Sequence, residues 1–186
     1  MDHTQLPVAE CLLGNDGQML CFALDRARKE FAWKTGGLTA EQLRRPRPPS
    51  TMSLAGLIKH LTFVEESFTA MAKGRDAHPE HEPDSEWQSA LADDPDDLYA
   101  AWYAAVGASR TTWAELIKDG GLDVIIDDPD PAWNKNRRRI LVDLLEENLI
   151  HLGHVDLLRE AIDGRRGHGW PDEDQPRAII EAISSA

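Results

Sequence analysis

One amphipathic stretch in the C-terminal part of the chain constrains the fold most. From Ile140 to Ile162, apolar residues recur at steps of three and four, which is the spacing of one face of an α-helix. Glu147, His151 and His154 interrupt this apolar stripe. Burying a carboxylate and two imidazoles costs on the order of several kcal/mol unless a partner compensates them, and a divalent metal ion suits this mixture of ligands. The stretch therefore predicts a long helix with a metal-binding face.

Glu147 and His151 are four residues apart, so their side chains lie one helical turn apart and can reach the same ion. The pair needs at least one further ligand, and His60 is the best candidate because it lies on the flank of another apolar helix face. Each residue also has a simpler interpretation. A single histidine near an apolar face is more often a hydrogen-bonded core residue than a ligand, and Glu147 could pair with His151 or with an arginine.

The apolar periodicity predicts an all-α four-helix bundle. The predicted helices are a first one capped by Asn15 or Asp16 and ended by Gly36-Gly37, a second from Ser53 to Gly74, a third from about Asp96 to Gly120-Gly121, and a fourth from about Arg137 to Asp163 followed by Gly164. The connections exceed ten residues, which is longer than antiparallel hairpins require, so one or more can cross the end of the bundle.

The connections have the composition of loops. Residues 76–96 contain three prolines among many acidic residues, which predicts a solvated loop, and residues 127–131 form an acidic connector rich in turn residues. His78 and His81, with Glu80 and Glu82, could form a second metal site, but such a loop would not hold them in place. No strand-like alternation competes with the all-helical interpretation.

The chain of 186 residues and 20.8 kDa has the length of one domain, here residues 1–186. Its bundle core is expected at about 15–164. Residues 165–186 form a C-terminal extension, whose Ile179, Ile180 and Ile183 predict a short amphipathic helix that packs back over the bundle.

The charge balance excludes several classes of partner. A net charge of −13 argues against nucleic acid, which requires a basic surface, and against an anionic membrane surface. No apolar run approaches the length of a membrane span and no secretion signal precedes the first helix, so we expect a cytoplasmic protein. Cys11 and Cys21 are too few for a disulfide framework and are expected to be reduced, non-catalytic thiols.

Three blocks of the sequence resemble the DinB/YfiT-like metalloprotein superfamily, in particular its large actinobacterial branch. They are GLTAEQLR at 37–44, SLAGLIKHL at 53–61, and the segment from Glu146 to Gly164. The resemblance implies a four-helix bundle with a divalent metal ion in an open pocket at one end. It places the metal ligands at His60, Glu147 and His151.

The carboxylate of Glu147, where many members have histidine, is similar to the N-terminal domain of mycothiol-dependent maleylpyruvate isomerase. His154 falls where many members have glutamine, so it is expected beside the metal, as a candidate catalytic residue that orients water or moves a proton.

The family resemblance implies a metal-dependent transferase or isomerase that uses a low-molecular-weight thiol such as mycothiol. The expected reaction is attack of this thiol on a small electrophile, with the metal making the thiolate available at neutral pH. Zinc is the first choice of metal, although nickel, iron and manganese accept the same ligands. The alternative is a non-catalytic, metal-stabilised bundle that acts as a dimeric binding or stress-response module. A homodimer is the expected assembly in either case.

Overall fold

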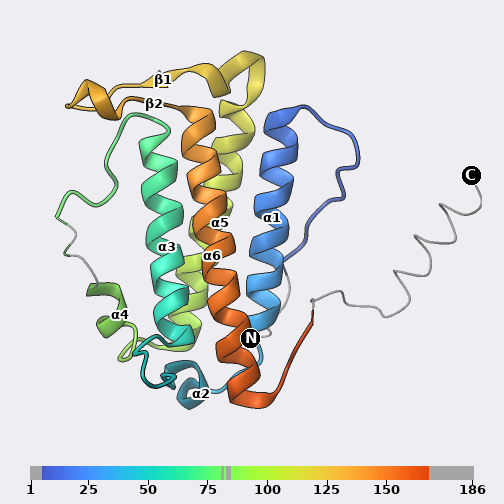
Figure 1. Cartoon of the computed structure of the whole chain (residues 1–186), viewed down its shortest axis with the longest axis vertical. Coiled ribbons are helices and arrows are strands. Elements are labelled where there is room, and N and C mark those ends of the chain that lie inside the picture. Colours follow the sequence, from blue (N-terminus) through green and yellow to red (C-terminus); the bar gives the residue numbers. More distant parts are fainter. Residues whose placement is uncertain (1–5, 81, 83–84, 168–186) are drawn as a thin grey trace, which may run out of the picture.

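The computed structural model describes residues 6–80, 82 and 85–167, and it confirms the all-α bundle. Four long helices lie side by side (Figure 1), namely α1 (Asp16–Thr35), α3 (Leu54–Met71), α5 (Pro95–Leu116) and α6 (Arg137–Asp163). Two short helices, α2 (Ala40–Arg44) and α4 (Ser85–Ser89), lie in the connections. The predicted C-terminal helix falls outside the described residues.

The ends of the helices follow from local capping chemistry. Asn15 caps α1 in a capping box with Gln18, and the hydroxyl of Ser53 caps α3 by accepting a hydrogen bond of 3.1 Å from the amide of Gly56. Gly164 ends α6 with a φ of 78°, a left-handed conformation in which glycine carries no steric penalty. These boundaries agree with the sequence-based prediction.

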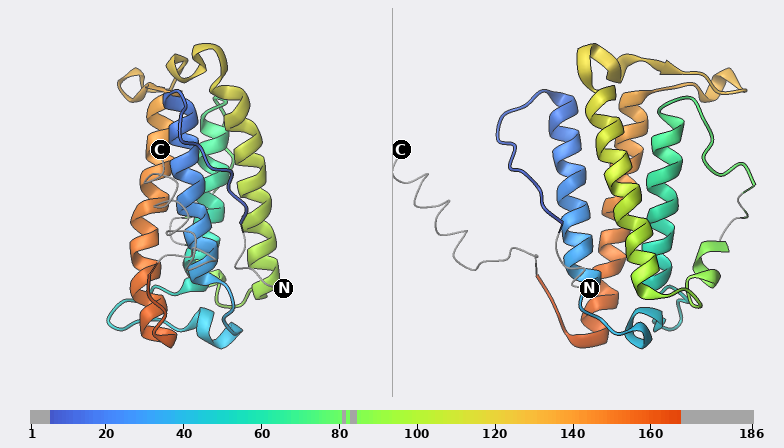
Figure 2. Two further views of the ribbon diagram at one scale, coloured as in Figure 1. Left: turned by 90° about the vertical axis from the view of Figure 1, so that its right-hand side faces the viewer. Right: turned by 180° about the vertical axis from the view of Figure 1, so that it is seen from behind.

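The connection between α3 and α5 is the long crossover of the bundle. It leaves α3 at the end where α6 begins, runs down the side of the bundle through α4, and enters α5 at the opposite end (Figures 1 and 2). Helices α3 and α5 therefore run in one direction, whereas α1 and α6 run in the other. Because of this crossover, α4 packs directly against α3.

A small hairpin was not predicted from the sequence. Strands β1 (Ile125–Ile126) and β2 (Lys135–Asn136) pair antiparallel, and they flank a 3₁₀ turn at Pro131–Trp133. The helix predicted to reach Gly120-Gly121 ends at Leu116 and continues as a 3₁₀ helix, Lys118–Asp123. Two-residue strands are too short to show the alternation on which strand prediction depends.

Large apolar side chains fill the space between the four long helices. Phe31 of α1 packs against Trp102 of α5 with ring centroids 5.1 Å apart, and Leu57 and Leu61 of α3 are fully buried beside them in the same core. Burial of each side chain of this size contributes about 1.5–3 kcal/mol. The core thus fixes the rotation of α3 and α6, which carry the candidate site. Among the described helices, none combines the length and the apolar character that a membrane crossing needs.

Candidate metal centre

The three predicted ligands come together where α3 packs against α6. His60 is on the second turn of α3, and Glu147 and His151 are one turn apart on α6. The ligand atoms of the three residues all lie within 4.8 Å of one another. The structure therefore brings together the three residues that the sequence pattern singled out, and their role as metal ligands stays a prediction.

The three side chains of the cluster face a common point. Nε2 of His151 lies 3.4 Å from Oε2 of Glu147, and Nε2 of His60 lies 4.0 Å from the same oxygen. The His60 and His151 rings meet edge to face with centroids 4.6 Å apart. The two imidazoles are 17% and 12% exposed but Glu147 is 38% exposed, so the cluster is accessible from the carboxylate side.

Two residues of α4 hold His60 in place, and both were missed in the sequence. Oε1 of Glu86 lies 2.8 Å from Nδ1 of His60, and the indole of Trp87 stacks on the imidazole at 4.7 Å. A proton on Nδ1 donated to Glu86 leaves the lone pair on Nε2, the atom that faces Glu147. The signal in the sequence was a lone tryptophan in a segment that otherwise has the composition of a solvated loop.

His151 is held in the neutral form. Burial, together with the positive charge that His60 and His154 would carry, lowers the pKa of His151 from 6.5 to about 4. A neutral imidazole has a free lone pair, which is the form that binds a metal ion.

His154 lies against His151 and is not one of the three converging residues. The Nδ1 atoms of His151 and His154 are 3.4 Å apart, on the side of the His151 ring away from Glu147. The geometry places His154 behind a candidate ligand, where it can hold a proton. Its predicted catalytic role stays a prediction.

The second candidate cluster does not form in the described part of the chain. His78 instead pairs with Glu66 at 2.9 Å and packs against Phe63, and His81 falls outside the described residues. Among the residues that the structure does describe, no second group of three histidine, cysteine or acidic side chains converges.

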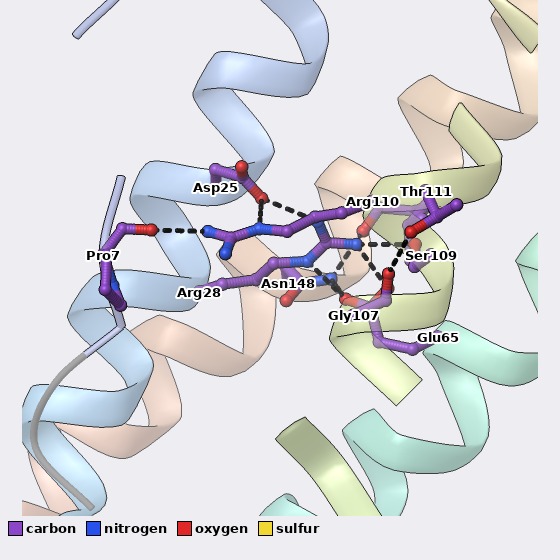
Figure 3. A network of polar contacts seen from close by, with 10 residues as sticks. Pro7, Asp25, Arg28, Glu65, Gly107, Ser109, Arg110, Thr111 and Asn148 are labelled. Carbon is purple, nitrogen blue, oxygen red and sulfur yellow. Dashed lines mark hydrogen bonds and ion pairs between the residues drawn. The ribbon is translucent and has the colours of Figure 1, made fainter. Parts of the chain in front are cut away.

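A buried ionic network connects the four long helices (Figure 3). Arg28 of α1 binds both carboxylate oxygens of Glu65 on α3, at 2.8 and 2.5 Å, and also donates to Ser109 of α5. The amide of Asn148, the residue after Glu147, donates to Glu65 at 3.3 Å. Because Arg28, Glu65 and Asn148 are at most 2% exposed, the network fixes the position of α3 relative to α6.

The donor set fits a divalent cation. Two neutral imidazole nitrogens and one carboxylate oxygen are the ligands that zinc and neighbouring transition metals accept, and three protein ligands leave a coordination position for a substrate. The carboxylate behind His60 is the outer-sphere partner that histidine ligands of metals commonly have.

Comparison with known proteins agrees with this arrangement. The crystal structure of "the conserved protein of locus" from Enterococcus faecalis has the same fold, with a TM-score of 0.67 over 82% of this chain and 100% of that chain, at 17% identity. No curated protein sequence matches at a significant level. The family model for mycothiol-S-transferase matches residues 19–164, which include all four long helices except the first three residues of α1. The chain therefore belongs to the mycothiol-S-transferase family.

Proposed function

We propose that the protein is a metal-dependent transferase or isomerase that joins a low-molecular-weight thiol such as mycothiol to a small electrophile. The observation that carries this proposal is the convergence of the ligand atoms of His60, Glu147 and His151 within 4.8 Å, beside an exposed carboxylate edge. The family name supports the thiol as cosubstrate. The bundle has no other described cluster of this kind.

His60, Glu147 and His151 would hold the cation. Zinc suits the three-ligand site best, and nickel, iron or manganese would also bind these donors. When bound, such a cation supplies positive charge that lowers the pKa of a nearby thiol, so that thiolate is available at neutral pH.

The nucleophilic sulfur comes from outside the protein. Burial raises the pKa of the Cys21 thiol to about 11, which leaves almost no thiolate at neutral pH. Cys21 also lies on α1, whereas the site lies between α3 and α6. An unactivated thiol on another helix cannot replace a cosubstrate.

The proposed reaction also depends on residues around the cluster. In the transferase reaction, a bond forms between the thiol sulfur and the electrophilic carbon, and the leaving group departs with its electron pair. The thiol proton must be removed, and we assign His154 to hold it, behind His151. Glu86 keeps the His60 imidazole oriented, and Trp87 covers one face of that ring and excludes water from it.

The first test measures metal content. The purified protein should contain about one transition-metal ion per chain by plasma emission. His151→Ala should lose this metal, and the control His78→Ala should retain it, because His78 lies outside the cluster. Equal metal content in His151→Ala and the native protein would disprove the ligand assignment.

The second test measures turnover. The metal-loaded protein is assayed for loss of free mycothiol in the presence of a panel of alkylating and unsaturated electrophiles, and turnover should disappear on treatment with a chelator. Bound metal without turnover over a broad panel would instead favour the non-catalytic, metal-stabilised binding module.

The expected homodimer and cytoplasmic location stay predictions, as does the division into one domain. Exposed apolar side chains on α6 support a homodimer, since Leu149, Ile150 and Leu157 are 50–68% exposed. Light scattering at micromolar protein concentration tests the assembly.

A further inference from the structure

A cavity of about 580 Å³ lies between the C-terminal half of α3, the first turn of α6 and the hairpin. The hairpin and the end of α3 line it, together with Phe63 and Ser67 of α3 and Ile140 of α6. This volume is within the range of small-molecule binding sites. Neither the metal ligands nor their supporting residues line it.

The cavity and the metal centre share two helix faces. Phe63 is three residues beyond His60 on α3, and Ile140 is seven residues before Glu147 on α6. At a rise of 1.5 Å per residue, seven residues correspond to about 10 Å along the helix. A ligand with its reacting atom at the metal centre would therefore extend into this cavity if its far end lay about 10 Å away.

The lining of the cavity suits a ring that carries many hydroxyl groups. Trp133 of the hairpin lines it although 65% of this residue is exposed, so its aromatic face is available to a ligand. The carboxylates of Asp127 and Asp128 are acceptors for hydroxyl groups, and Arg75 and Lys135 are donors. The mixture of both charges gives no preference for an anion such as phosphate.

We propose that this cavity binds the carbohydrate portion of the thiol cosubstrate, with Trp133 stacking on a sugar or cyclitol ring. The inference rests on the proposed function. Mycothiol carries its sulfur on an acetylated cysteine and its hydroxyl groups on a glucosaminyl-inositol portion at the other end. One end of such a molecule would meet the metal centre and the other end the hairpin, so a thiol without the carbohydrate should be a poorer cosubstrate.

The binding test uses glucosaminyl-inositol, which has the carbohydrate portion without the sulfur. Calorimetry of the full-length, metal-loaded protein should detect its binding, and Trp133→Ala should weaken the affinity roughly tenfold or more. The matched control is Ile125→Ala, because Ile125 is 64% exposed on the same hairpin but does not line the cavity. Binding that is absent from the native protein, or equal in Trp133→Ala, would overturn the proposal.

The kinetic test compares mycothiol with N-acetylcysteine. The ratio of kcat/KM for the two thiols should fall roughly tenfold in Trp133→Ala through a higher KM for mycothiol, and should not change in Ile125→Ala. A higher KM for the electrophile alone would assign the cavity to the other substrate and overturn the proposal.

The two proposals fail separately. If His151→Ala abolishes turnover and Trp133→Ala has the native thiol preference, the function stands and the cavity assignment fails. If glucosaminyl-inositol binds at Trp133 and no metal-dependent turnover occurs, the cavity assignment stands and the enzyme proposal fails.

Discussion

Oε1 of Glu86 lies 2.8 Å from Nδ1 of His60, so a carboxylate on the short helix α4 orients an imidazole on α3. This contact connects the long crossover to the candidate metal centre. It also gives α4, a helix of five residues, a role that its length alone would not suggest.

Glu86→Ala should lower the affinity for zinc by about 10–100-fold, the usual cost of losing such an outer-sphere partner. The reason is that His60 would lose the acceptor that fixes its tautomer and ring orientation. Glu86→Gln keeps an acceptor oxygen and should recover part of the loss. Competition with a chromogenic chelator measures the affinity. Glu82→Ala, which removes an exposed carboxylate from the same connection, is the control, and equal affinities in Glu86→Ala and the native protein would contradict the assignment.

Gly56→Ala, a substitution on α3, should disturb the same site through Trp87 of α4. A Cβ at Gly56 would lie 2.7 Å from Cε3 of Trp87, the residue that stacks on His60, so the indole would have to move. We expect the free energy of unfolding to fall by about 1–3 kcal/mol, as for an overpacked core, together with weaker zinc binding. Urea denaturation and metal titration measure the two effects.

The control for this substitution is Gly107→Ala on α5. Gly107 is exposed, and a Cβ there meets nothing within 4 Å. The better helix propensity of alanine should raise the free energy of unfolding by about 0.5–1 kcal/mol. Equal effects of the two alanines would mean that the contact with Trp87 does not constrain α4.

The four long helices and the three candidate ligands could be predicted because both signals are local. A repeat of 3.6 residues is visible within one segment, and Asn15, Ser53 and Gly164 are capping residues that act within one turn. His60, Glu147 and His151 could be identified because polar side chains interrupt apolar faces, and because the family resemblance pointed to the same positions.

The supporting structure could not be predicted because it depends on tertiary contacts. Helix α4 is too short to show a period, and Glu86 meets His60 only because the crossover runs along α3. The pairing of Arg28 with Glu65 depends on the rotation of two helices about their axes, which no single segment encodes. The hairpin could not be predicted either, because its strands have only two residues each and show no alternation of apolar and polar residues.

Glu65→Ala should be among the most destabilising substitutions in the protein. It would leave the guanidinium of Arg28, which is 2% exposed, with Asp25 as its remaining carboxylate partner. Removal of one member of a buried ion pair costs about 3–5 kcal/mol, so the urea midpoint should fall strongly.

An exposed pair provides the comparison. Glu41 of α2 and Arg45, the residue after this helix, form an ion pair with side chains 86% and 51% exposed. Glu41→Ala should change the free energy of unfolding by less than about 1 kcal/mol. A loss below about 1 kcal/mol for Glu65→Ala as well would show that the buried network does not stabilise the bundle.

The metal-free protein should lose stability as the pH falls from about 6.5 to 4. The pKa of His151 is lowered to about 4 in the folded state, mainly by burial, against 6.5 for an ordinary histidine. Between these values the unfolded chain binds the additional proton, so acidification favours unfolding. The contribution of this one histidine over the whole window is up to about 3 kcal/mol.

Urea denaturation of chelator-treated protein at several pH values measures this dependence. Carboxylates titrate in the same range, so the informative quantity is the difference between the native protein and His151→Gln, which cannot take up the proton. The native curve should fall more steeply with acid than the variant curve, and His78→Gln should follow the native curve because it leaves His151 intact. Parallel curves for the native protein and His151→Gln would show that the surroundings of His151 do not hold it neutral. The protonation state matters because the neutral imidazole is the form that binds a metal ion.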